Sequence, residues 1–342
     1  MFRDYIEFSL NGKPHQVRGE AIFQPLSSYL RYSRGLTGTK VVCAEGDCGA
    51  CSVMARRPDG EFCAMNSCIA MTFLLDGMDL VTVEGLAKDG KLNEIQNSMV
   101  RNFGGQCGFC TPGFVMAITD LFEHKPQVNE KQARNALTGN LCRCTGYQPI
   151  LNAVLDVNVR QHQRLGERFT TGVAKNKTPV LIEFGEQTFY APADLTSACR
   201  YRVENPGAVI FSGSTDLGVR YNKGHIRPRH FMSLNLIDGL YDLGVAGDEI
   251  SVGARVNLAQ LSRFLKPHIP EFAQFLNIFA SPQIKNSATL IGNLANASPI
   301  ADTTPLLMSL DAEVDVRGVG GARTIALSDF YLGYKKTRAQ SR

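Results

Sequence analysis

The sequence predicts an α+β protein built from several domains. At 342 residues the chain has room for about two to three domains of ordinary size. Alternating polar and apolar residues surround Asn11-Gly12, whereas residues 92–156 show the 3.6-residue periodicity of helices. Strand-like and helix-like segments are mixed in the remainder of the chain. We therefore expect domains at residues 1–86, 87–157 and 179–342, with a polar linker at residues 158–178.

Composition narrows the class of protein. Hydrophobic residues make up 44% and charged residues 20% of the chain, which suits a folded protein with a buried core. The 36 Lys and Arg against 32 Asp and Glu leave a net charge of +4 without a dense basic block, which argues against nucleic acid as the main partner. The chain has no run of about 18 apolar residues, the length that would predict a membrane span. Its first residues, MFRDYIEFSL, lack the apolar core of a signal peptide. We expect a cytoplasmic protein.

The first two segments have clear local signals. DYIEFSLNGKPHQVRGE predicts a β-hairpin turning at Asn11-Gly12, and a helical stretch follows near Leu26–Tyr32. A Gly-rich loop is expected at residues 35–51. The periodicity of the second domain predicts four helices, and Pro112 and Pro149 lie where two of them would begin.

The third segment is marked mainly by its glycines. Gly-rich turns are expected at residues 212–218 and 291–293. The run Gly318-Val-Gly-Gly321 lies between two strand-like segments and predicts a hairpin turn.

Cysteine usage points to metal or redox chemistry. Nine of the ten cysteines lie before residue 145, at short spacings, and only Cys199 lies beyond. A disulfide scaffold is typical of small secreted proteins, whereas clustered thiols in a protein of this kind favour metal ligation. Cys199 is expected to be a buried free thiol.

The first cysteine set is Cys43-x4-Cys48-x2-Cys51, the spacing of plant-type 2Fe–2S proteins. Gly46 and Gly49 allow the positive φ that a loop needs when its N–H groups turn toward sulfur atoms. A fourth ligand must come from downstream, where Cys63 and Cys68 compete. A structural zinc site is the alternative, although it usually has a Cys-x2-Cys pair on each side.

The second cysteine set pairs Cys107-x2-Cys110 with Cys142-x-Cys144 across the helical segment. Four thiolates suit zinc and iron–sulfur about equally, so the spacing indicates a metal without identifying it. A redox-active Cys-x-x-Cys is less favoured because a second pair is present. Thr-Pro-Gly after Cys110 predicts the start of a helix whose N-terminal dipole faces the site.

These two sets, in this order, resemble the iron–sulfur part of the molybdenum hydroxylases, the xanthine dehydrogenase and aldehyde oxidase family. The matching strings are TGTKVVCAEGDCGACSV, NSCIA, VEGL, QCGFCTPGFVM and GNLCRCTGYQPIL. The resemblance implies two 2Fe–2S clusters, with Cys68 as the fourth ligand of the first and Cys63 as a bystander. It also implies that Gln106 contacts the pterin of a molybdenum cofactor held by a partner; a helix-capping role is the alternative for this residue.

The segment after residue 180 resembles the FAD domain of the same family. Backbone N–H groups at Gly213–Thr215 can cradle a diphosphate without a lysine. Phe279 would cover the isoalloxazine ring, although an isolated aromatic is more often a core residue. Asp302 would suit a hydroxyl on the ribose or adenine side. The residues expected to bind FAD are Ile210, Phe211, Ser212, Gly213, Ser214, Thr215, Asp216 and Leu217 in a first loop, and Phe279, Thr289, Gly292, Asn293, Ser298 and Asp302 in a second region.

The family resemblance implies a β-grasp 2Fe–2S domain, a four-helix 2Fe–2S domain and an α+β FAD-binding domain. The last is expected to be incomplete at its C-terminus, since the chain stops at YLGYKKTRAQSR. No G-x-G-x-x-G is present, so a Rossmann-type flavin site is excluded.

The activity implied is that of a xanthine dehydrogenase-like small subunit without catalytic residues of its own. Electrons from a molybdenum-binding large subunit would pass through both clusters to FAD, and then to NAD or oxygen, within a heterotetramer. The alternatives are the small subunit of an aldehyde oxidase-type enzyme, a stand-alone iron–sulfur flavoprotein reductase, and an interaction protein with zinc in its cysteine sites.

The six histidines are expected to be ordinary surface or core residues. None pairs with a Cys, Asp or Glu at convincing ligand spacing along the sequence; they are His15, His124, His162, His225, His230 and His268.

Overall fold

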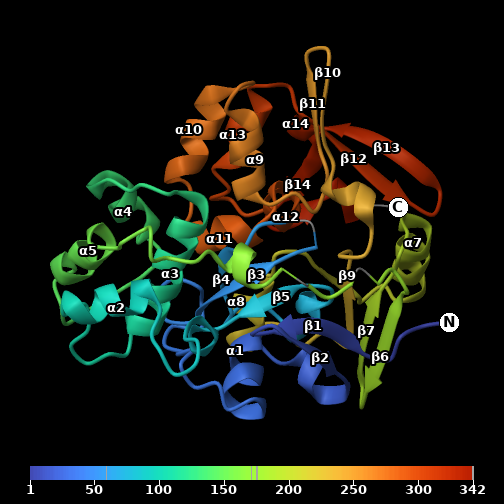
Figure 1. The fold of residues 1–342 in the computed structure, drawn as a ribbon. Helices are drawn as coiled ribbons and strands as arrows, with labels where there is room; N and C mark the ends of the chain where they lie inside the picture. Colours follow the sequence, from blue (N-terminus) through green and yellow to red (C-terminus); the bar gives the residue numbers. More distant parts are fainter. Residues whose placement is uncertain (59, 171, 175, 341–342) are drawn as a thin grey trace.

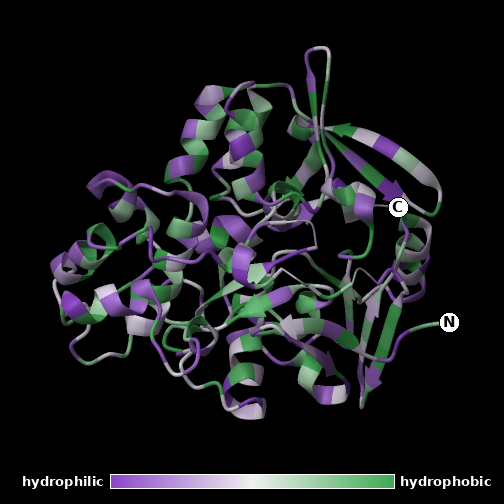
Figure 2. Cartoon of the chain, viewed as in Figure 1, coloured by the Kyte–Doolittle hydropathy of each residue, from purple (hydrophilic) through white to green (hydrophobic). Residues whose placement is uncertain are grey.

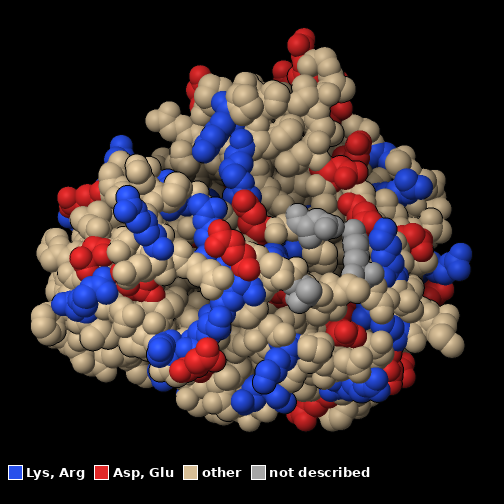
Figure 3. Space-filling model, viewed as in Figure 1, with Lys and Arg blue, Asp and Glu red and all other residues tan. Residues whose placement is uncertain are grey.

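The structure is a computed structural model that describes residues 1–58, 60–170, 172–174 and 176–340. A central N-terminal sheet lies between a group of helices on one side and a second sheet on the other, and the C-terminal helices and hairpins lie above them (Figure 1). Lys, Arg, Asp and Glu side chains are interspersed over the face shown in Figure 3. No helix among the described residues is long and apolar enough to cross a membrane.

The N-terminal sheet has five strands in the order β2-β1-β5-β3-β4. β1 and β5 are parallel, and the other neighbouring strands are antiparallel. The expected hairpin is confirmed, because Asn11 and Gly12 both have positive φ in a two-residue turn. The elements are β1 (Ile6–Leu10), β2 (Lys13–Val17), α1 (Leu26–Ser28), continued by a π-helical turn at Tyr29–Ser33, β3 (Ser52–Arg56), β4 (Cys63–Asn66) and β5 (Asp79–Val81).

Four helices follow, as the periodicity predicts. They are α2 (Glu94–Arg101), α3 (Thr111–His124), α4 (Glu130–Ala136) and α5 (Gln148–Leu155). Pro112 and Pro149 lie in the first turns of α3 and α5, where the missing N–H costs no helix hydrogen bond.

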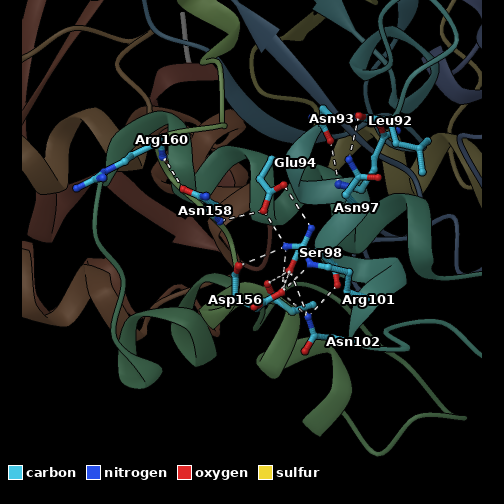
Figure 4. A network of polar contacts seen from close by, with 12 residues as sticks. Leu92, Asn93, Glu94, Asn97, Ser98, Arg101, Asn102, Asp156, Asn158 and Arg160 are labelled. Carbon is cyan, nitrogen blue, oxygen red and sulfur yellow. Dashed lines mark hydrogen bonds and ion pairs between the residues drawn. The ribbon is translucent and has the colours of Figure 1, made fainter.

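A buried carboxylate ties α2 to the end of α5 (Figure 4). Glu94 accepts hydrogen bonds from Arg101 at 2.8 Å and from the Asn158 N–H at 3.0 Å. Arg101 also donates to Asp156, which accepts a further hydrogen bond from Asn102. The network therefore joins both ends of α2 to the residues that leave α5.

The expected linker packs against both preceding domains. It contains α6 (Leu165–Arg168), in which Leu165 is buried and donates its N–H to Glu123 of α3. Arg168 donates to the carbonyl oxygens of Leu86 and Ala87. Thr171 and Lys175 of this segment lie outside the described residues.

The remaining chain forms a second sheet and a helical layer. The sheet order is β6-β7-β9-β8, and Figure 2 shows hydrophobic and hydrophilic residues alternating along α9 and α10, as in helices with one buried face. The elements are β6 (Val180–Phe184), β7 (Gln187–Ala191), α7 (Leu195–Glu204), β8 (Val209–Phe211), α8 (Leu217–Asn222), β9 (His230–Ser233), β10 (Leu243–Ala246), β11 (Glu249–Val252), α9 (Leu258–Leu265), α10 (Pro270–Ile278), α11 (Pro282–Ser287), α12 (Leu290–Asn296), α13 (Thr303–Met308), β12 (Glu313–Gly318), β13 (Gly321–Ala326), α14 (Leu327–Phe330), β14 (Tyr331–Gly333) and β15 (Lys336–Thr337).

One of the two expected Gly-rich turns is wrong. Residues 291–293 lie inside α12, which Thr289 caps by accepting the Gly292 N–H. The hairpin between Gly318 and Gly321 is confirmed, since these two residues pair at the end of β12 and β13.

The two sheets share one hydrophobic core. Phe73 stacks on Phe189 with ring centroids 4.6 Å apart, and it meets Phe211 and Phe231 edge-on at 5.4 and 5.7 Å. All four rings are fully buried. The first and third expected domains are therefore packed together through their interiors.

Candidate functional site

The first cysteine set closes around one point. Cys43, Cys48 and Cys51 lie on the loop before β3, and Cys68 follows β4. The Cys68 thiol is hydrogen-bonded to the sulfur atoms of Cys43 and Cys51, and Cys43 also contacts Cys48. Cys51 and Cys68 are buried, whereas Cys43 and Cys48 are half-buried.

The loop stabilises negative charge on sulfur. A hydrogen bond from Cys68 lowers the pKa of Cys43 to about 3, with help from the N–H groups of Glu45 and Cys48. Hydrogen bonding with the sulfurs of Cys43 and Cys51, together with burial, raises the pKa of the Cys68 thiol. Gly46 and Gly49 both have positive φ, as expected. Four converging sulfur atoms with N–H donors fit a tetrathiolate iron–sulfur site.

Cys63 is not part of this set. It begins β4, where its sulfur lies 3.6 Å from Nε2 of His124 on α3. The structure therefore separates the two residues that spacing alone left in competition.

The second cysteine set forms a more exposed site. The sulfurs of Cys107 and Cys144 lie 3.4 Å apart, and Cys110 is hydrogen-bonded to Cys142. Burial and the contact with Cys142 raise the pKa of Cys110 to about 12. Cys107 and Cys144 are exposed. Cys110 is the N-cap of α3, so the helix begins where the Thr-Pro-Gly motif predicts.

The two thiol sets are directly connected through the backbone. The Leu141 N–H, one residue before Cys142, donates to the Cys48 carbonyl oxygen at 3.0 Å. The Asn140 side chain donates to the Gly49 carbonyl oxygen at 3.1 Å. A Cβ at Gly49 would lie 2.2 Å from the Gly139 carbonyl oxygen, so this close approach requires glycine.

The third domain contacts the same loops through two polar side chains. Gln283 of α11 is almost fully buried and donates to the Asn140 side chain at 2.7 Å. Asn222 of α8 donates to the carbonyl oxygens of Ala44 and Cys68, both at 2.8 Å. Asn140, Gln283 and Asn222 were not predicted at the site from the sequence. Asn140 stands in the string GNLCRCTGYQPIL, and Gln283 lies between Phe279 and Thr289 of the second expected FAD region, whereas Asn222 has no local signal.

The two expected FAD regions come together in part. Ser212 and Thr289 lie with their hydroxyl oxygens 3.2 Å apart. A Cβ at Gly213 would lie 2.0 Å from the Ser287 carbonyl oxygen, so this glycine permits close packing of the two segments. Ser214 follows with a φ of 63°. The loop then enters α8, at whose N-terminus Asp216 is the cap residue.

A cleft of about 520 Å³ lies beside this loop. Thr215 and Asp216 line it with Ala280 and Ser281 from the second region, and Glu45 and Asp47 contribute from the first thiol loop; Thr138, Val219, Arg220 and Ile284 complete it. Among the described residues, the buried Ser214 Oγ and Asp216 Oδ2 have no hydrogen-bond partner. Unpaired polar atoms beside a cleft fit a polar ligand such as a nucleotide cofactor.

Other expected FAD residues have packing or capping contacts. Phe279 stacks on Phe275 with ring centroids 5.6 Å apart. Asn293 accepts a hydrogen bond from Thr303, and Ser298 accepts the N–H of Ile300. Asp302 caps α13 without a side-chain hydrogen bond to its first turn. Gln106 is exposed beside Cys107.

Comparisons with known families match two segments of the chain. Residues 183–342 match the family described as the FAD binding domain in molybdopterin dehydrogenase, and residues 82–155 match a 2Fe-2S binding domain. Xanthine dehydrogenase 1 of Arabidopsis thaliana is 30% identical over 91% of this chain. Xanthine dehydrogenase/oxidase of Rattus norvegicus is 28% identical over 98% of it. The chain spans 28% and 30% of the length of these relatives.

Among solved structures, quinoline 2-oxidoreductase from Pseudomonas putida 86 is 35% identical, with a TM-score of 0.41. The similarity covers 48% of this chain and 95% of that one.

The chain is thus a mixed α/β, multidomain protein with 2Fe-2S-binding and FAD-binding domains. At the level of the family, the chain is similar to the iron–sulfur and FAD-binding portion of the xanthine dehydrogenase-like molybdenum hydroxylases.

Proposed function

We propose that this chain carries electrons from the molybdenum centre of a partner, through two 2Fe–2S sites and FAD, to NAD or oxygen. The observation that carries the proposal is the series of contacts between the three sites. The Leu141 N–H joins the second thiol set to Cys48 of the first, and Asn222 joins the first set to α8 and the FAD loop. Short, fixed distances between redox sites favour electron transfer because the tunnelling rate falls steeply with distance.

Each thiol set would hold one cluster. Cys43, Cys48, Cys51 and Cys68 would ligate the first, and Cys107, Cys110, Cys142 and Cys144 the second. When bound, such clusters accept and release single electrons, and hydrogen bonds to their sulfurs set the potentials. The Glu45 N–H to Cys43 and the Thr145 hydroxyl near Cys142 are the chain's own contributions to that setting. The order of strands β1 to β5 supports a β-grasp fold around the first site.

The FAD would occupy the cleft beside residues 210–217. The N–H groups of Gly213–Thr215 would hold the diphosphate, with Thr289, Gly292 and Asn293 supporting the loop. Phe279, Ser298 and Asp302 would contact the flavin and the nucleoside ends. Because Glu45 and Asp47 line the same cleft, bound FAD would lie next to the first thiol loop.

A molybdenum-binding large subunit would dock at the second thiol set. Cys107 and Cys144 are exposed there, and so are the apolar side chains of Phe103, Phe109 and Leu141. Exposed apolar residues around a redox site are typical of a protein–protein interface. Gln106 lies in the same segment and would contact the pterin of the partner, in a heterotetrameric assembly.

The relatives named xanthine dehydrogenase support xanthine as the proposed substrate of the assembled enzyme. All ten cysteines are free thiols, which supports a reducing, cytoplasmic location. The functional units would be residues 1–86, 87–157 and 179–342.

Cofactor content tests this proposal. Protein purified anaerobically is expected to hold about four irons and four sulfides per chain, with FAD, and to give two electron paramagnetic resonance (EPR) signals when reduced. A colourless protein with zinc and no sulfide would contradict it. Reduction by xanthine should occur only with the large subunit present, whereas rapid reoxidation of NADH by this chain alone would favour a stand-alone reductase.

A further inference from the structure

Three metal-ligating side chains meet outside the two thiol sets. They are Cys63 at the start of β4, and Asp120 and His124 one turn apart on α3. Their ligand atoms all lie within 4.8 Å of one another. The expectation that no histidine pairs with such residues is therefore wrong for His124, because Asp120 and His124 share one helix face at i and i+4 and Cys63 reaches them through the tertiary fold.

Both distances from Nε2 of His124 match the edges of a zinc tetrahedron, and the distance to the Asp120 carboxylate is longer than an ordinary hydrogen bond. Nε2 of His124 lies 3.6 Å from Sγ of Cys63 and 3.5 Å from Oδ1 of Asp120. With ordinary zinc–ligand bond lengths, tetrahedral geometry puts sulfur and nitrogen about 3.6 Å apart, and nitrogen and oxygen about 3.4 Å apart. A hydrogen bond to a carboxylate would instead be about 2.7–3.2 Å long.

Neighbouring groups orient two of these side chains. The Ala64 N–H, next to Cys63 in β4, donates to Oδ1 of Asp120 at 3.0 Å. A carboxylate oxygen of Glu61 lies 3.4 Å from Nδ1, the other ring nitrogen of His124. A carboxylate on the distal nitrogen is the usual companion of a metal-bound histidine, since it fixes the ring and its tautomer.

We propose that Cys63, Asp120 and His124 bind one divalent transition metal of the zinc class. A thiolate, an imidazole and a single carboxylate suit zinc, whereas magnesium and calcium prefer oxygen ligands alone. The side chains of Asp120 and His124 are 15% and 25% exposed, which leaves a fourth position open to water. The metal would pin α3, whose first residue follows Cys110, to the edge strand of the N-terminal sheet.

A nucleophilic Cys–His pair is the competing interpretation. Nε2 can donate its single hydrogen to only one acceptor, yet it faces both Cys63 and Asp120 at nearly equal distance. Three donors around one point favour the metal.

Thiol protection in the cluster-loaded full chain tests the proposal. Zn²⁺ is titrated anaerobically, and alkylation by iodoacetamide is followed for each cysteine by peptide mass spectrometry. At zinc ten times its Kd, alkylation of Cys63 should slow about tenfold. Cys199 serves as the internal control, and zinc should leave its rate of alkylation unchanged. It is half-buried, whereas the sequence led us to expect a buried thiol.

Variants assign the protection to this site. His124→Gln and Asp120→Asn should lose it, and the asparagine can still accept the Ala64 N–H. His225→Gln, at an exposed histidine, should keep it. Iron content measured on the same samples should stay constant. The proposal would be overturned if zinc did not slow the alkylation of Cys63, or if His124→Gln kept full protection. It would also be overturned if the protein took up zinc only while losing iron.

Discussion

At the scale of single residues, Gly49 shows why the loop of the first thiol set contains glycine at this position. Its φ of 65° favours glycine for conformational reasons, and the space where a Cβ would stand is taken by the Gly139 carbonyl oxygen. The spacing of the cysteines predicts the first requirement. The lack of space for a Cβ arises from Gly139, 90 residues away, so no local sequence pattern can predict it.

We expect Gly49→Ala to destabilise the protein more than Gly77→Ala. Both residues have similar positive φ, which costs an alanine about 1 kcal/mol, but a Cβ at Gly77 meets nothing within 4 Å. Overpacking at Gly49 should add about 1–3 kcal/mol. Urea unfolding of the two variants measures the difference, and equal losses would show that the Gly139 contact is unimportant.

Cys68→Ser should abolish one EPR signal of the reduced protein and leave the other intact. Serine at residue 68 removes the thiol that both Cys43 and Cys51 contact. Cys63→Ser is the matched control, since it lies five residues earlier and faces His124 instead. If Cys63→Ser removes a signal while Cys68→Ser does not, the assignment of the fourth ligand fails.

At the scale of elements, periodicity and proline predict α2 to α5 because each helix has an apolar face and a recognisable start. The same reasoning fails at residues 291–293, where Gly292 suggested a turn. Thr289 caps α12 there, and the cap decides the local structure. In the expected linker, α6 forms because Glu123 supplies an acceptor for its first N–H groups, and this partner lies 42 residues away.

Gln283→Ala should weaken the contact between α11 and both thiol loops. The substitution leaves the buried Asn140 without its 2.7 Å partner, at a cost of about 1–3 kcal/mol in the free energy of unfolding. Gln148→Ala removes a similar amide–amide contact to Asn152 on an exposed surface, and should cost less than about 0.5 kcal/mol. Thermal unfolding compares the two, and similar losses would mean that burial of the Gln283 contact does not matter.

Because of the α2–α5 network, the free energy of unfolding should depend on pH in the acidic range. Burial alone would raise the pKa of Glu94, but hydrogen bonds from Arg101 and Asn158 outweigh it and lower the pKa below its usual value. The stabilisation is therefore fully present above about pH 4.5 and is lost as pH falls through the lowered pKa. Glu94→Gln should be less stable than the parent at pH 7, and the difference should shrink below pH 4.5. A difference independent of pH would show that the charge of Glu94 is not involved.

At the scale of the whole molecule, the order of modules is readable from the motifs, but their packing is not. The strings around the cysteines and glycines predict which segments would approach cofactors. Phe73, Phe189 and Phe231 belong to no motif, and the ring of Phe211, which was expected at the FAD loop, lies with them in one buried core that only the fold creates. The cluster of Cys63, Asp120 and His124 was overlooked for the same reason, since its members come from two domains.

Phe73→Ala should destabilise both sheets together. Truncating a fully buried ring that touches three aromatics of the second sheet should cost about 3–5 kcal/mol. Phe184→Ala, on the exposed side of β6, should change stability by less than about 0.5 kcal/mol. Cluster absorbance and flavin fluorescence should change in one coincident transition, and two separate transitions would show that the sheets fold independently.

The shared aromatic core has a consequence for how the chain can be cut. The iron–sulfur half and the flavin half meet through rings that neither half can expose to water without loss of solubility. Two co-expressed fragments, broken within residues 171–175, should therefore find each other and reassemble, whereas either fragment made alone should aggregate. The two halves of the polypeptide therefore resemble the subunits of an obligate heterodimer that are joined by a covalent linker.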